Sequence, residues 1–132
     1  MIVTDFTGDH SVQSMAQLEQ RLEVRFQNEQ NLFHLTPDSG DYPAVTIHVR
    51  GDLAAIYYLP EDRHAGYVSL GGKMNLGPKE WTTFSITKRD PGETIDVPNE
   101  FIVPFSEALK VAKEFFHSQE RPRSIEWTQQ WK

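Results

Sequence analysis

The sequence predicts an α+β protein, in which a mainly antiparallel sheet of about five to six strands is flanked by an N-terminal and a C-terminal helix. Three observations lead to this prediction. Apolar residues recur every three or four positions from Ser11 to about Gln27, alternate with polar residues in 44–50, and form a second helical stripe after Ser106. With no internal repeat and no linker, residues 1–132 are expected to form a single domain.

The first half of the chain predicts one helix and a strand hairpin. Ser11 is the expected N-cap of a helix whose apolar face carries Val12, Met15, Leu18, Leu22 and Phe26. NLFHLT (31–36) is typical of a short strand that ends before a proline. AVTIHVR (44–50) alternates as a half-buried strand does, RGD supplies the turn, and LAAIYYL (53–59) is apolar throughout. We therefore expect 53–59 to be a central strand covered on both faces, with Tyr57 and Tyr58 on opposite sides.

The second half predicts further strands around a second helix. YVSL (67–70) and WTTFSIT (81–87) are expected strands, and the latter should place Trp81, Phe84 and Ile86 in or near the core. KRDPGETIDVPNE (88–100) indicates a polar connection. The helix from Ser106 has an apolar stripe and cannot continue through Pro122, after which SIEW (124–127) alternates as an edge strand. The stripe consists of Leu109, Ala112, Phe115 and Phe116.

Charge is unevenly distributed. Nineteen acidic and thirteen basic side chains give a net charge of −6, which disfavours direct binding to the phosphates of nucleic acids. Acids predominate in 26–62, where the only base is Arg50, and they stand alone in 90–100. These segments indicate either acidic loops that keep the protein in solution or an acidic docking face, and composition does not decide between them.

No local motif indicates catalysis or a bound cofactor. GYVSLGGKM (66–74) resembles a phosphate loop, but Gly72 separates the second glycine from the lysine and Met74 stands where a hydroxyl is required. We interpret the glycine pair as a strand end or bulge. The histidines show no metal-binding spacing, although His34 and His48 could face each other across strands. No cysteine is present and no serine lies in a nucleophile motif, so no catalytic residue, metal or cofactor is predicted.

The chain also lacks the patterns that direct a protein into or across a membrane. No apolar run approaches the roughly 20 residues of a membrane span. The first residues, MIVTDFTGDH, do not combine a basic region with an apolar one. We therefore expect a soluble, cytoplasmic protein without a membrane partner.

The pattern of the whole chain resembles Imm1, an immunity-protein family of bacterial polymorphic toxin systems. The resemblance runs from about Leu32 to Trp127 and rests on NLFHLTPDSGDYPAVTIHVRGDLAAIYYL, on GYVSLGG and on VPFSEALKVAKEFFHSQERPRSIEW. The paired aromatics at the end of the apolar strand, the helix ending in Phe115 and Phe116, and the closing Pro122 and Trp127 are the similar features. They indicate architecture rather than chemistry. The first thirty residues and 88–100 match the family pattern poorly.

The resemblance implies a protein without enzymatic activity that binds a cognate toxin domain and blocks its active site, expected at one-to-one stoichiometry. Such toxins include DddA-like deaminases that convert cytosine to uracil in double-stranded DNA. A toxin that handles DNA needs a positively charged cleft, which an acidic partner can occupy. From the chemistry of acidic and aromatic anchors we predict these partner-binding residues: Asp38, Asp41, Tyr42, Glu61, Asp62, Tyr67 and Trp81.

Two other function classes remain open at this point. The chain could be a small enzyme whose active site uses dispersed residues without a local motif, which would show a deep polar pocket and turnover without a partner. It could instead be a general acidic interaction module for a basic host protein. The neighbouring genes separate that alternative from an immunity protein, because only the latter is expected beside a toxin gene.

Overall fold

The fold is an antiparallel sheet with helices on one face and a two-stranded ribbon on the other. The computed structural model describes residues 1–72, 74–89 and 91–129. The predicted α+β class is confirmed, but the described residues contain more strands than the five to six expected. That the chain forms one domain stays a prediction. No helix within the described part of the chain is both long and apolar enough to cross a membrane.

Eight strands among the described residues form the main sheet. They are β1 (Ile2–Asp5), β2 (Gly8–Ser11), β3 (Gln30–Thr36), β4 (Ala44–Arg50), β5 (Leu53–Leu59), β6 (Tyr67–Ser69), β9 (Val103–Pro104) and β10 (Trp127–Gln129). Their order is β10-β6-β5-β4-β3-β1-β2, and β9 pairs with the first two residues of β5. The ribbon is β7 (Trp81–Ser85) paired with β8 (Thr94–Pro98). Two short 3-10 helices precede strands: η1 (Gln27–Glu29) lies before β3, and η2 (Asn99–Phe101) lies between β8 and β9.

The N-terminal region differs from the prediction. The first helix, α1 (Met15–Leu22), is shorter than expected, and its N-cap is Ser14, whose hydroxyl accepts a hydrogen bond from the Gln17 amide at 3.2 Å. Ser11 instead ends β2, which forms a hairpin with β1. Because the GDHS sequence of β2 is polar and contains glycine, it lacks the apolar alternation by which a strand is recognised.

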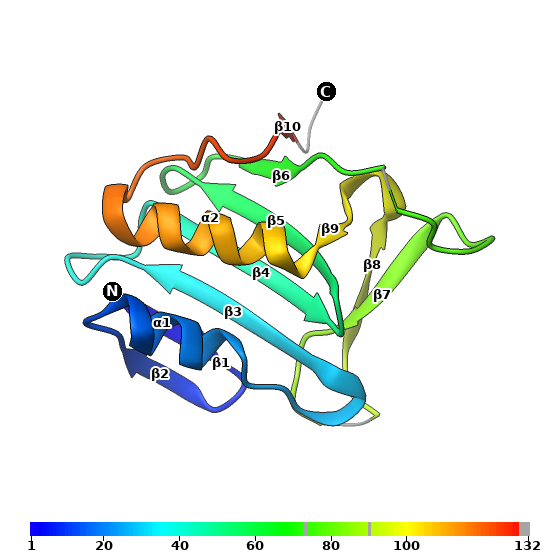
Figure 1. Cartoon of the computed structure of the whole chain (residues 1–132), viewed down its shortest axis with the longest axis horizontal. Coiled ribbons are helices and arrows are strands. Elements are labelled where there is room, and N and C mark those ends of the chain that lie inside the picture. Colours follow the sequence, from blue (N-terminus) through cyan, green and yellow to red (C-terminus); the bar gives the residue numbers. More distant parts are fainter. Residues whose placement is uncertain (73, 90, 130–132) are drawn as a thin grey trace.

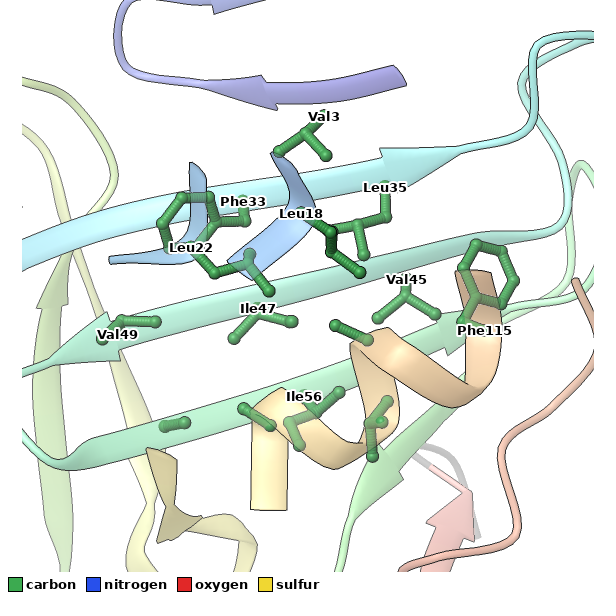
Figure 2. Close-up of a cluster of buried hydrophobic side chains, with 14 of the residues drawn as sticks. Val3, Leu18, Leu22, Phe33, Leu35, Val45, Ile47, Val49, Ile56 and Phe115 are labelled. Atoms are coloured by element: carbon green, nitrogen blue, oxygen red, sulfur yellow. The ribbon is translucent and has the colours of Figure 1, made fainter. Parts of the chain in front are cut away.

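The second helix agrees closely with its prediction. α2 (Phe105–Ser118) ends where Gln119 adopts a left-handed conformation, three residues before Pro122. Both helices lie on the same face of the main sheet, side by side (Figure 1). Their buried side chains meet the inward residues of β3, β4 and β5 in one cluster, which Figure 2 shows with Leu18, Ile47 and Phe115 among its members.

The central strand β5 is covered on both faces, as predicted. Ile56 and Tyr58 belong to the main core under the helices, whereas Ala55 and Tyr57 face a second cluster under the ribbon. Phe84 of β7 is fully buried in that second cluster. The two adjacent tyrosines therefore point to opposite sides of the sheet.

Two predictions for the ribbon region are wrong. The segment 88–100, expected to be a connection, contains β8. The strand is not evident from the sequence, because only Ile95 and Val97 pack into the second cluster and most of the other residues are polar. Trp81, expected in or near the core, is 46% exposed. Asp90, one of the acids in this segment, lies outside the described residues.

Candidate functional site

Two loops that carry most of the predicted partner-binding residues leave the main sheet at the same end. Residues 37–43 join β3 to β4, and residues 60–66 join β5 to β6 (Figure 1). The last pair of the β4–β5 ladder is Ala44 with Leu59, so the loops emerge from adjacent strands. Five predicted residues lie in these loops: Asp38, Asp41, Tyr42, Glu61 and Asp62.

The loop 37–43 borders a hollow of about 530 Å³. Two of its carboxylates are already engaged, because Asp38 pairs with the N-terminal ammonium of Met1 at 2.8 Å and Asp9 accepts a hydrogen bond from the Thr4 hydroxyl at 2.7 Å. Asp41 is exposed and lies near His34. The hollow is lined by Ile2, Thr4, Asp9, His34, Thr36, Pro37, Asp38, Gly40, Asp41 and Tyr42, which include three acids and no lysine or arginine.

The floor of this hollow contains a half-buried histidine. The Nδ1 atom of His34 lies 2.8 Å from the Thr46 hydroxyl on the neighbouring strand. Burial lowers the pKa of His34, and the carboxylate of Asp41 opposes that shift. Tyr42, at the rim, is 41% exposed. The hollow thus combines negative charge with an exposed aromatic ring, a combination suited to a basic side chain of a partner.

Tyr67 is held in a stack of side chains behind the second loop. The His64 ring stacks on Tyr67 with centroids 5.5 Å apart, and the Arg121 guanidinium lies 4.5 Å from the centroid of the Tyr67 ring. Tyr67 also packs against the main core. It therefore links the loop 60–66 to the segment after α2, and only part of its surface is open to a partner.

This end of the sheet carries charges of both signs. Glu61 and Asp62 are exposed, and so are Arg63 in the same loop and Arg121 in the segment after α2. The sequence shows an excess of acids between 26 and 62, but it does not show that Arg121 lies near them in space. Chain order hides this proximity, because β6 and β10 bring the two regions together only in the sheet.

Trp81 lies apart from the other predicted residues. It begins β7 in the ribbon, which crosses the end of the sheet remote from the loops 37–43 and 60–66 (Figure 1). The seven predicted residues therefore do not form one surface. An interface that contained Trp81 and Asp41 together would have to extend along the whole sheet.

The structure also shows a polar cluster that the sequence did not predict. The buried Asp5 carboxylate accepts hydrogen bonds from the Thr7 amide at 2.8 Å and the Thr7 hydroxyl at 2.6 Å, and its Oδ1 lies 3.2 Å from His10 Nε2. Arg21 Nη1 lies 3.2 Å from His10 Nδ1. Burial raises the pKa of Asp5, but the Thr7 hydrogen bonds and the charges of Arg21 and His10 outweigh burial and hold it below its usual value.

This cluster resembles a catalytic triad in composition but not in geometry. A general base needs one ring nitrogen for the nucleophile and the other for the carboxylate. Here Thr7 and Asp5 both approach Nε2 of His10, while Nδ1 faces a guanidinium, which only donates. The cluster connects the β1–β2 hairpin to α1. The sequence pattern contains no signal for this cluster, because the polar β1–β2 hairpin that builds it is not predicted from the sequence.

The two histidines considered as a metal pair lie in different environments. His34 contacts Thr46 across the ladder, whereas His48 is buried between Tyr57 and Phe84. Burial lowers the pKa of His48 to about 4, so the ring is neutral at pH 7. Within the described residues, no group of three His, Cys, Asp or Glu side chains is arranged to hold a metal ion.

Comparison with known proteins covers nearly the whole chain. The family model for immunity protein Imm1 matches residues 7–129. A protein of Burkholderia cenocepacia (strain H111), named double-stranded DNA deaminase immunity protein, is 25% identical over 129 residues, which span 98% of this chain and 99% of that protein. The match to the family extends beyond the resemblance seen in the sequence, because it includes most of the first thirty residues.

Proposed function

This chain belongs to the Imm1 family of immunity proteins, and from that premise we propose that it binds and inhibits a deaminase toxin that acts on DNA. The family match carries the proposal. The name of the Burkholderia relative supports the deaminase as target, since the two chains align over almost their full lengths. We place the protein in the cytoplasm of the producing cell, where such a toxin would meet the genome.

The proposed mechanism is occlusion. A deaminase that acts on DNA needs basic residues near its active site to hold the phosphates, and a partner with net charge −6 is attracted to the same residues. We propose that the loops 37–43 and 60–66 face that cleft, because they present Asp41, Glu61 and Asp62 at one end of a rigid sheet. Contacts through Tyr67 and through Trp81 remain part of the proposal, on separate parts of the surface.

The proposal assigns no chemistry to this chain. In a zinc deaminase, the metal-bound water and a glutamate carry out the reaction, so both would belong to the toxin. Obstruction by a folded partner at one-to-one stoichiometry is sufficient to keep DNA out. Electrostatic attraction also accelerates capture, to about 10⁸ M⁻¹s⁻¹ or more at low salt, which is important when free toxin damages the host.

Co-expression with the toxin domain that we expect to be encoded beside this gene tests the proposal. We expect cells to survive only when both genes are expressed, and we expect the two proteins to copurify at one-to-one stoichiometry. Equal killing with and without this chain would contradict the proposal. A second measurement, deamination of a double-stranded oligonucleotide by the purified toxin, should show inhibition that is complete at equimolar protein.

A further inference from the structure

A groove lies where the start of α2, the end of β6 and the segment before β10 meet. Its volume is about 420 Å³, and its wall combines apolar side chains with charged ones. The groove, called here the Leu70 groove, is lined by Leu70, Gly71, Met74, Ile102, Val103, Pro104, Glu107, Arg123, Ser124, Ile125 and Glu126.

Backbone contacts hold the two walls of the Leu70 groove in place. The Leu70 amide donates to the Glu126 carbonyl at 3.0 Å, and the Gly71 amide donates to the Glu100 carbonyl at 2.6 Å. Any Cβ on Gly71 would collide with the carbonyl of Ile102, so only glycine allows this close approach. Gly71, the first of the two glycines that resembled a phosphate loop in the sequence, thus has a structural role: it lines a preformed groove.

The chemistry of the groove suits an apolar side chain with a positive neighbour. Leu70 is 39% exposed, one of few large apolar residues that the described chain leaves open to solvent. Among the described lining residues, the charged ones are Glu107, Glu126 and Arg123. The Arg123 amide donates to the Glu114 carboxylate of α2, which fixes this rim to the helix. The described part of the rim is therefore net negative, and six of the described lining residues are apolar.

The groove is continuous with the end of the sheet proposed to face the toxin. Arg123 lines the Leu70 groove and also lines an adjoining hollow beside Pro60 and Tyr67, at the root of the loop 60–66. One partner surface can therefore contact Glu61 and reach the groove along the segment after α2. An apolar core with a polar rim is the usual anatomy of a protein–protein interface.

We infer that the Leu70 groove receives an apolar side chain of the toxin that stands next to a lysine or arginine in the toxin sequence. The inference rests on the proposed function and adds a second contact to it. The acidic loops attract the toxin and accelerate association, whereas the groove slows dissociation, because burying an apolar side chain removes it from water.

The experiment uses full-length protein and the neighbouring toxin domain, inactivated by substitution of its catalytic glutamate. Leu70→Gln removes the apolar contact without adding charge, and Ala16→Gln on the exposed surface of α1 is the matched control. We expect Leu70→Gln to weaken binding by roughly tenfold to a hundredfold, mainly through faster dissociation, while Ala16→Gln binds like the wild type. Thermal unfolding of both variants checks that each is folded.

Hydrogen exchange of the wild-type complex gives a second readout that no substitution affects. The amides around the groove, at 72 and 124–126, should gain protection when the toxin binds. If the wild-type protein binds but these amides are unchanged and Leu70→Gln binds equally well, the groove inference is wrong and the proposed function stands. If the wild-type protein binds no toxin, the proposed function is wrong as well.

Sedimentation of the free protein tests a different occupant, a second copy of this chain. We expect a monomer at all concentrations measured. A dimer that Leu70→Gln dissociates would overturn the inference, because the groove would then be occupied by another copy. Retention of an apolar dye such as ANS by wild-type protein, and its displacement by the toxin, would support it.

Discussion

The two faces of the main sheet are covered in different ways. The helix face buries side chains from α1, α2 and five strands of the sheet in one continuous core. The ribbon face has a small cluster, whose buried members among the described residues are Ala55, Phe84, Val97 and Ile102. Since stability scales with the apolar area removed from water, the helix face should determine global unfolding. The ribbon should behave as a weaker unit that can open separately.

The largest expected effect comes from the helix face. Phe115→Ala should lower the free energy of unfolding by about 3–5 kcal/mol, because Phe115 is fully buried between α2 and the sheet. Denaturant unfolding followed by circular dichroism measures the change. Lys110→Ala, on the exposed side of the same helix, should change it by less than about 0.5 kcal/mol.

Phe84→Ala makes on the ribbon face the same change of residue type that Phe115→Ala makes on the helix face. We expect faster hydrogen exchange in β7 and β8, while amides of α2 and β4 remain protected. If exchange accelerates equally in α2, the ribbon and the main sheet unfold as one unit and the comparison between the faces fails.

The next largest expected effect is a loss of stability at low pH, which arises on the ribbon face. His48 is buried and neutral, with a pKa lowered by burial from 6.5 to about 4, and its Nδ1 has no hydrogen-bond partner among the described residues. The unfolded state binds the proton more tightly, so stability falls as the pH drops from about 6.5 towards 4, by about 3 kcal/mol. Denaturant unfolding at several pH values measures this loss. His48→Phe should remove this part of the pH dependence, whereas the contributions of Asp5 and His34 remain in both proteins.

The affinity for the toxin should depend more on the acids of the loop 60–66 than on the acids of the ribbon. Glu61→Lys combined with Asp62→Lys should weaken binding about tenfold at low salt, with most of the change in the association rate. Glu80→Lys combined with Glu93→Lys makes the same change of net charge on the ribbon and should have a smaller effect. Association rates measured at several salt concentrations give the comparison. Equal losses would mean that only the total charge is important.

The smallest effect is expected at Trp81. Because this side chain is 46% exposed, Trp81→Ala should change the free energy of unfolding by less than about 0.5 kcal/mol. We expect it to weaken toxin binding less than Tyr42→Ala does, since Tyr42 stands beside Asp41 in the loop 37–43. Calorimetric titration of both variants measures the difference. A greater loss for Trp81 would place the ribbon at the centre of the interface.

The sequence predicted the elements whose apolar residues follow a clear period. β4, β5 and α2 agree with the prediction within one or two residues, because each has a regular buried stripe. β2 and β8 were missed. Both are largely polar, and each is a strand because a neighbouring strand satisfies its backbone hydrogen bonds. The residue pattern of a short segment does not show whether a neighbouring strand will pair with it.

The candidate site was predicted only in part for a related reason. The sequence identified acidic, solvent-exposed loops, and hairpin connectivity was enough to bring 37–43 and 60–66 to one end. It did not reveal that Arg121 stacks on Tyr67 or that Trp81 lies at the opposite end.

By itself, the sequence determined the α+β class, the central position of β5 and the second helix, because these follow from local periodicity and composition. The family was indicated separately, by the resemblance of the whole chain to Imm1. The tertiary structure decided which charges share a surface, why Gly71 must be glycine and where the Leu70 groove lies. Those properties depend on residues far apart in the chain. Their proximity is created by strand pairing and by packing against a common core.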